Sequence, residues 1–344
     1  MMLISMCRRV LAVVVLAVLA PFMAATPASA LPGEQPWEMY DGPGTTTAST
    51  PNAAHNILTG VTMTVWRGLT DDGIWYEARD SSGAKTPNLP SANSHTNYAP
   101  AIAPAGRGFV MVHTGTDGNL YYSVNADSSS PQNWTSWTPV KYTDASGTRN
   151  ASSKDGPSII EIDGNVTIAY HARSSSAIYT IDGTVSGSSV NWYNNVRMNV
   201  TSSYAPAIAN YGGRLYVAYR ADSGVGNGHV YWSHRTGQGT ADWTNGTPVR
   251  SFGSQPGVGR PAIATHNATL DVATLTGTNT TGPHGILRIQ WNGSSWGSWE
   301  PDPQGFQTAS PVSMHAGLIG SSIVMLMRGL DENAIWEKTV SDIN

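Results

Sequence analysis

The sequence predicts an all-β protein, a β-propeller of six blades with four antiparallel strands each. A unit of roughly fifty residues recurs six times, and each copy opens on proline followed by small or apolar residues. The six copies open at Pro51, Pro100, Pro157, Pro206, Pro261 and Pro311. Several short strands per unit at this period are typical of a propeller. A seventh blade of degenerate sequence remains an alternative.

The second strand of each unit is the clearest element. It is a near-continuous apolar run, as expected for a strand that is covered on both faces. The six runs span 63–67, 109–113, 166–171, 215–220, 270–274 and 323–328. Third strands follow from Ile74, Leu120, Ile178, Val230, Ile286 and Ile335. Asp-Gly pairs between the runs, such as Asp117-Gly118, indicate hairpin turns.

The two ends of the chain complement each other. The sixth unit stops after three strands, and the segment 35–39 before the first unit offers the missing fourth strand. Trp37 lies in that segment and matches the outer-strand tryptophans Trp134, Trp192, Trp243 and Trp296, which we expect to pack between blades. We therefore expect one domain, 31–344, whose ring is closed by an N-terminal strand.

Residues 1–30 have the pattern of a secretory signal peptide. Arg8 and Arg9 precede an apolar run too short to span a membrane comfortably, and Ala28-Ser29-Ala30 is a cleavage pattern that leaves Leu31 first. Cleavage also removes Cys7, the single cysteine, so an exported chain is expected to hold together by packing and ring closure. We expect a secreted protein with no membrane span.

Composition and motifs narrow the function classes. Without Arg8 and Arg9, 17 basic residues face 23 acidic ones, which argues against nucleic acid as a partner. The chain has no H-E-x-x-H motif, and we expect neither a metal site nor a cofactor. Gly293-Ser294-Ser295-Trp296-Gly297 matches the nucleophile-elbow pattern but lies in a turn before a strand, where that motif has no meaning.

The last residue of the second strand is the strongest candidate for function. Counting back seven residues from the third strand gives a cationic or titratable side chain in four units, and Arg220 precedes a longer loop in a fifth. The set is Arg67, His113, His171, Arg220 and Arg328. We expect a ring around one mouth of the central funnel, able to bind sugar hydroxyls or a carboxylate.

A structural role competes with this interpretation. Each side chain could instead pair with a carboxylate of its own loop, at Asp71, Asp117, Asp222 or Asp331, and fix the turn. We expect the structural role for Arg67 and Arg328, and ligand contact for Arg220, His113 and His171. The third-strand aromatics could stack on sugars or fill gaps between blades. They are Trp75, Tyr121, Tyr179, Tyr231 and Trp336.

Two segments carry a resemblance. Arg328-Gly329-Leu330-Asp331 with Ile335-Trp336, and Arg67-Gly68-Leu69 with Ile74-Trp75, resemble the repeat of bacterial PLL-like propellers, the Photorhabdus-type lectins. Trp134 with Trp137, and Trp296 with Trp299, echo the Trp-x-x-Trp strand of that repeat. The chain is loosely similar also to secreted Streptomyces propellers of the dispase autolysis-inducing type. The resemblance implies glycan binding in clefts between blades, or action on a secreted protease.

The expected function is therefore secreted, non-enzymatic recognition of neutral or acidic glycans. One alternative is a propeller that binds a secreted or cell-surface protein, such as a protease, or serves as an envelope scaffold. A second alternative is a glycoside hydrolase or lyase with its active site in the funnel, for which the sequence does not show which carboxylates face each other.

Overall fold

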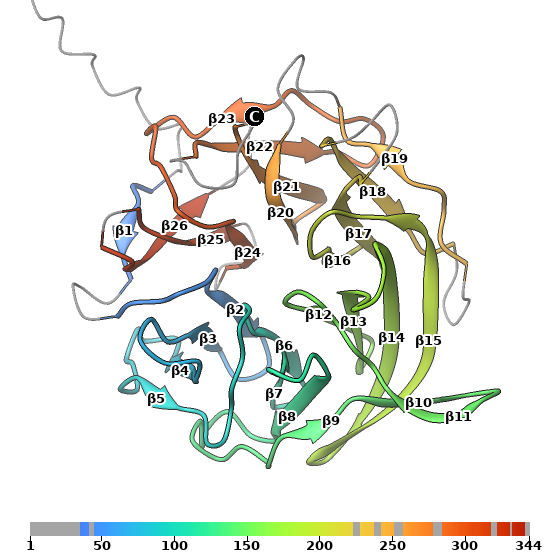
Figure 1. Cartoon of the computed structure of the whole chain (residues 1–344). Coiled ribbons are helices and arrows are strands. Elements are labelled where there is room, and N and C mark those ends of the chain that lie inside the picture. Colours follow the sequence, from blue (N-terminus) through green and yellow to red (C-terminus); the bar gives the residue numbers. More distant parts are fainter. Residues whose placement is uncertain are drawn as a thin grey trace, which may run out of the picture.

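The computed structural model describes residues 35–40, 45–222, 228–236, 242–250, 257–277, 284–317, 322–330 and 332–340. Six four-stranded antiparallel sheets stand around a central axis, which confirms the all-β fold and the six blades (Figure 1). No helix occurs among the described residues, so none there is long and apolar enough to cross a membrane. The expected signal peptide, 1–30, lies outside the described residues.

Each of the first five blades contains four strands in chain order, with the first strand beside the axis. The first three blades are β2 (Asn52–Asn56), β3 (Val61–Arg67), β4 (Ile74–Arg79) and β5 (Leu89–Pro90); β6 (Ala101–Ala105), β7 (Gly108–Thr114), β8 (Leu120–Asn125) and β9 (Thr138–Pro139); β12 (Ser158–Ile162), β13 (Asn165–His171), β14 (Ala177–Ser186) and β15 (Ser189–Thr201).

The remaining blades repeat this order, and the last one borrows a strand from the N-terminus. They are β16 (Ala207–Tyr211), β17 (Arg214–Arg220), β18 (Val230–His234) and β19 (Thr247–Pro248); β20 (Val258–His266), β21 (Thr269–Leu275), β22 (Ile286–Trp291) and β23 (Glu300–Pro301); β24 (Ser313–Ala316), β25 (Ile323–Arg328), β26 (Ile335–Val340) and β1 (Glu38–Met39).

The hydrophobic core lies between the blades. Each of the six buried clusters found among the described residues joins two neighbouring sheets. Between blades 2 and 3, for example, Val110 and Val112 pack with Ile168 and Trp192. Second strands are therefore apolar on both faces, and every residue of β7 is buried. The ring is held by these six interfaces, since each blade packs only on its neighbours.

The N-terminal strand closes the ring, as the sequence predicts. Strand β1 pairs antiparallel with β26, with Glu38 opposite Glu337 and Met39 opposite Trp336. The Trp37 side chain is buried against blade 5, where its Nε1 donates to Asp302 Oδ2 at 2.6 Å. Lys338 of β26 donates to Asp302 Oδ1 at 2.5 Å, so one carboxylate holds both strands of the closing pair.

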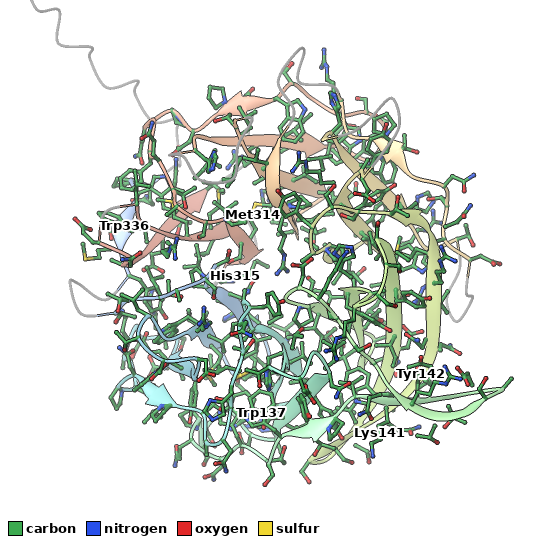
Figure 2. All side chains as sticks on the ribbon, viewed as in Figure 1. Trp137, Lys141, Tyr142, Met314, His315 and Trp336 are labelled. Carbon is green, nitrogen blue, oxygen red and sulfur yellow. The ribbon has the colours of Figure 1, made fainter. Side chains whose placement is uncertain are left out.

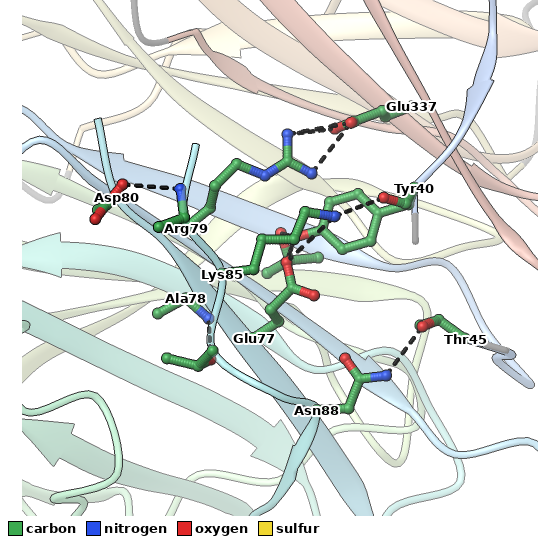
Figure 3. A network of polar contacts seen from close by, with 12 residues as sticks. Tyr40, Thr45, Glu77, Ala78, Arg79, Asp80, Lys85, Asn88 and Glu337 are labelled. Atoms are coloured by element: carbon green, nitrogen blue, oxygen red, sulfur yellow. Dashed lines mark hydrogen bonds and ion pairs between the residues drawn. The ribbon is translucent and has the colours of Figure 1, made fainter. Parts of the chain in front are cut away.

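Tyr40, directly after β1, continues this closure into blade 1 (Figure 3). Its buried ring lies between blades 6 and 1, and its hydroxyl donates to Glu77 Oε1 at 2.9 Å. Lys85 Nζ donates to the Tyr40 carbonyl at 2.7 Å, and Arg79 forms an ion pair with Glu337 of β26 at 3.1 Å. Burial and the Glu77 carboxylate raise the pKa of Tyr40 well above its ordinary value, so the phenol stays protonated.

The sequence pattern missed two features of the outer surface. Strands β14 and β15 are much longer than their counterparts, and the hairpin of β10 (Lys141–Asp144) and β11 (Gly147–Asn150) extends beyond blade 2 (Figure 1). The β10–β11 hairpin consists of polar and exposed residues and has no apolar periodicity, whereas β15 carries apolar residues at most alternate positions from Val190 to Val200.

Candidate functional site

Strand register separates the candidate cations into two sets. The last residue of each second strand pairs with the first residue of the third strand, as Arg67 does with Ile74. The residues at this position are Arg67, Thr114, His171, Arg220, Leu275 and Arg328. His113 pairs instead with Tyr121, one position earlier. The loop of blade 2 is one residue shorter than that of blade 1, so the seven-residue count misaligned His113.

None of the five predicted cations lines the funnel. The funnel wall consists of first-strand residues from all six blades, while the second strands lie one strand further out. The five cations therefore lie outside the funnel lining, and a role for them in ligand binding stays a prediction. Within the described residues, the funnel lining also holds no Asp or Glu, so no two carboxylates face each other across the funnel.

Arg328 makes structural contacts. Its Nη1 donates to the carbonyl of Ala48 at 3.0 Å and its Nη2 to that of Ala309 at 3.3 Å. These carbonyls lie on the two connections that lead into blades 1 and 6, and burial lowers the pKa of the guanidinium. Asp331, the loop carboxylate expected beside Arg328, lies outside the described residues. Arg67 occupies the same register and is also half-buried, and its Nε has no hydrogen-bond partner in the part of the chain that the structure describes.

His171 is fully buried, although we expected it to contact ligand. Its Nδ1 lies 2.6 Å from Asp155 Oδ2, a residue of the connection that enters blade 3. The pairing therefore joins the strand end to the chain segment before the blade, not to the loop of the same hairpin. A ligand on the surface cannot reach this ring in the present conformation.

Arg220 makes weaker contacts than Arg328. Its guanidinium lies over the Tyr204 ring at 4.9 Å, and its Nε donates to the Gly228 carbonyl at 3.3 Å. Asp222, the loop carboxylate expected beside it, accepts a hydrogen bond from Ser203 instead.

The third-strand aromatics form a repeated row near the same rim. Each is half-buried and pairs with the second-strand position that His113 occupies: Trp75 with Trp66, Tyr121 with His113, Tyr179 with Tyr170, Tyr231 with Tyr219 and Trp336 with Met327. Further out, Trp75, Tyr121 and Tyr231 each face a proline of the fourth strand. Five of the six blades therefore present one partly exposed aromatic ring to the preceding blade, whereas blade 5 has Leu287 at this position.

The outer-strand tryptophans fill gaps between blades. Trp134 lies edge-on to Tyr76 of blade 1 at 5.7 Å, Trp192 to Tyr122 of blade 2 at 5.5 Å, and Trp296 to Trp232 of blade 4 at 6.0 Å. Trp243 packs with the cluster between blades 3 and 4.

A cleft of about 660 Å³ lies on this rim between blades 1 and 2. Blade 2 contributes His113, Tyr121, Trp134 and Trp137, while blade 1 and its exit connection contribute Tyr76, Ser91, Asn93 and His95. Trp137 stands edge-on to the His113 ring at 4.4 Å, and its Nε1 donates to Ser91 Oγ at 3.2 Å. His113 in turn stacks on Tyr121 at 5.6 Å.

Four tyrosine and tryptophan rings, two histidine rings and several other hydrogen-bonding groups thus share one cleft. The candidate residues His113 and Tyr121 are brought together there. Trp137, Ser91 and His95 were not predicted. The Trp-x-x-Trp spacing could have indicated Trp137, whereas Ser91 and His95 come from another blade and have no sequence signal.

Electrostatics give this cleft one anionic group. Asp117 accepts from the Tyr121 hydroxyl at 2.9 Å and from Asn119 Nδ2 at 2.6 Å. Burial acts to raise the pKa of Asp117, but the Asn119 and Tyr121 hydrogen bonds outweigh it and lower the pKa. Burial lowers the pKa of His113 to about 4, so this ring is neutral at pH 7.

The other clefts are unequal. The corresponding cleft between blades 6 and 1 has a volume of about 180 Å³ and is lined by Trp66, Trp75, Leu69 and Asp71. Trp75 Nε1 lies 3.4 Å from Asp71 Oδ1. A cleft of about 570 Å³ between blades 3 and 4 opens on the opposite rim around the buried Arg235–Asp182 ion pair. The described residues contain no cluster of His, Cys, Asp and Glu that could hold a metal ion.

Comparison with known proteins shows the fold. No family model and no curated protein matches the chain. Among solved structures, the SapL1 lectin in complex with alpha methyl fucoside aligns with a TM-score of 0.58 and 13% identity, over 87% of this chain and 95% of that one. A mutant of the Aleuria aurantia lectin in complex with alpha-methyl-L-fucoside aligns with a TM-score of 0.56 and 13% identity, over 86% and 93%.

A Hadza microbial sialidase, Hz136, aligns with a TM-score of 0.59 and 12% identity. The match covers 85% of this chain, which spans only 65% of the sialidase. Glycan-binding propellers and a glycan-cleaving one thus share the architecture at identities that establish the fold alone. The finer resemblance to PLL-like or dispase-related propellers gains no support from a family model.

Proposed function

We propose that the protein is a secreted, non-enzymatic, lectin-like binding protein that recognises neutral glycans in the cleft between blades 1 and 2. The observation that carries the proposal is the meeting of Tyr121, Trp137 and Asp117 in one open cleft. Sugar rings offer flat C–H faces to aromatic side chains and hydroxyl donors to carboxylates. Concave sites with aromatic walls and a few placed polar groups are the usual form of small-ligand sites.

The charge of the cleft favours neutral over acidic sugars. Asp117 is ionised and His113 is neutral at pH 7, so these two groups contribute one negative charge. An acidic sugar would meet repulsion from Asp117, whereas a neutral sugar can donate a hydroxyl hydrogen bond to it. We therefore narrow the expected ligand class from neutral or acidic glycans to neutral ones.

Support for the lectin class over the hydrolase class comes from the funnel. A glycoside hydrolase needs two carboxyl groups flanking the scissile bond, and the described funnel lining holds neither. The propeller lectins among the structural neighbours show that this architecture can carry sugar sites. Secretion rests on the pattern of residues 1–30, and sequencing the protein from culture supernatant should find Leu31 as its first residue.

A glycan array tests the proposal. The mature chain should bind a set of neutral glycans, and Trp137→Ala should lower the binding at least tenfold. Trp299→Ala is a matched control, because Trp299 follows the same Trp-x-x-Trp spacing in blade 5, outside this cleft. An array without hits, or equal binding by the Trp137 variant and the wild type, overturns the proposal.

A further inference from the structure

The central funnel contains a cavity of about 190 Å³ that the glycan cleft does not share. Its wall is built from the first strands of all six blades, and most of its side chains are alanine, isoleucine, proline, valine or methionine. Met314 and His315 lie beside the central opening (Figure 2). Small alanines keep the axis open, whereas larger side chains on these strands would fill it.

Most polar side chains at the mouth where the first strands begin form hydrogen bonds with neighbouring blades. Asn52 Nδ2 donates to the Pro100 carbonyl at 2.5 Å, and Ser313 Oγ donates to the Pro51 carbonyl at 2.5 Å. Ser158 Oγ accepts from the Ile208 amide at 3.2 Å. These bonds fasten adjacent blades and leave those groups little capacity for a ligand.

Arg260 differs from these polar side chains, because within the described part of the chain it is not hydrogen-bonded to a neighbouring blade. A β-bulge interrupts the pairing of β20 with β21 between Val258 and Ala262, and Gly259 there has a φ of +74°, a region that favours glycine. The bulge places Arg260 on the funnel wall. Among the described residues, its guanidinium has neither a hydrogen bond nor an ion pair, and Asp155 is the one charged group that acts on it.

The Arg260 side chain is half-buried in the funnel wall, and no carboxylate in the described part of the chain is free to balance its charge. Burial lowers the pKa of Arg260 to about 10, against a smaller opposite effect of Asp155, so the side chain remains charged at pH 7. Asp155 is already engaged, because its Oδ2 lies 2.6 Å from His171 Nδ1. Even partial burial of a charge without a partner is unfavourable, and an anion in the funnel would relieve that cost.

The other titratable groups on the wall are neutral at this pH. Burial lowers the pKa of His315 to about 4, and burial also lowers the pKa of His55. Arg260 is therefore the one charge among the described residues that line the funnel at pH 7. A single cation at one end of an otherwise uncharged cavity selects a monoanion with an apolar body.

We propose that the funnel is a second binding site, for a small carboxylate with an apolar body whose carboxylate pairs with Arg260. The planar guanidinium fork matches a carboxylate with two parallel hydrogen bonds. An apolar cavity of about 150 Å³ holds a benzene ring, so the funnel can hold a ring-sized acid. This site is independent of the glycan cleft.

Calorimetric titration at pH 7 and low salt tests the proposal with benzoate as the probe. Benzoate should bind one to one, and benzyl alcohol, of similar shape but neutral, should bind at least tenfold more weakly. D-Glucuronate distinguishes a sugar acid from an apolar acid and should also bind at least tenfold more weakly than benzoate. No benzoate binding, equal binding of benzyl alcohol, or tighter binding of glucuronate overturns the assignment.

Two arginine variants assign the binding to Arg260. Arg260→Met should lose at least tenfold in benzoate affinity, while the matched control Arg214→Met, exposed at the far end of β17, should keep it. Thermal melts guard against a folding artefact: because Arg260 has no described partner, the Arg260→Met protein should melt no lower than the wild type. Wild-type benzoate affinity in Arg260→Met, or a clear drop in its melting temperature, would make Arg260 a structural residue and overturn the proposal.

Discussion

At the scale of residues, the arginines that end the second strands of different blades have different structural roles. Arg328 and Arg220 share one strand register, yet Arg328 bonds two connecting carbonyls while Arg220 stacks on Tyr204. The sequence could predict this position, because it ends a recognisable apolar strand. It could not predict the partners, because Ala48 and Tyr204 lie on connections from other parts of the chain.

Replacing each arginine with alanine should show the difference between these roles as a difference in stability. Arg328→Ala should lower the free energy of unfolding by about 1–3 kcal/mol, because two half-buried carbonyls lose a charged donor. Arg220→Ala should cost about 1 kcal/mol or less, because it loses one long hydrogen bond and a cation–π contact. Urea unfolding of both variants measures the difference, and equal large losses would contradict the smaller structural role assigned to Arg220.

His113 should make stability depend on pH. Its pKa in the folded protein is about 4, below the value of about 6.5 for an exposed histidine, so the unfolded chain binds the proton more readily. Its contribution is present above pH 6.5 and is lost as the pH falls towards 4. Between pH 7 and pH 5 this amounts to about 2 kcal/mol.

The measurement is urea unfolding of His113→Gln and of the wild type at both pH values. The wild type should lose about 2 kcal/mol more than the variant between pH 7 and pH 5. His315, with a pKa also lowered to about 4, adds a similar loss to both proteins and cancels in the comparison. An identical pH dependence for the two proteins would show that His113 titrates normally.

At the scale of elements, strand identity could be predicted but loop length misled the alignment. The apolar second strands and the N-terminal closing strand were predicted, because burial on both faces imposes an unbroken apolar run. His113 was misplaced by one position because the blade 2 loop is shorter, and a shift of one residue turns a side chain to the opposite face of a strand. That shift moved His113 into the aromatic row of the cleft.

Removal of the closing strand should destabilise the whole domain. Deleting residues 31–42 takes away the β1 pairing and the buried Trp37, and Trp37→Ala alone should cost about 3–5 kcal/mol. Thermal melts of the deletion and of Trp37→Ala against the full mature chain measure this loss. Melting at the wild-type temperature would mean that the ring does not depend on this strand.

At the scale of the whole molecule, six packed interfaces set a common scaffold while a few side chains make the clefts unequal. Repetition in the sequence predicts the interfaces, because each blade buries the same apolar face. It cannot predict the cleft between blades 1 and 2, because that cleft combines Trp137 and His113 with Ser91 and His95 across a blade boundary. Repeats therefore indicate architecture, and departures from the repeat indicate the site.

The most direct test of the central claim is a crystal structure of the mature protein with a neutral glycan selected on the array. We predict sugar density between blades 1 and 2, with a ring against Trp137 or Tyr121 and a hydroxyl on Asp117. Sugar density in the funnel, on the opposite rim or between other blades, with the cleft between blades 1 and 2 empty, would contradict this claim.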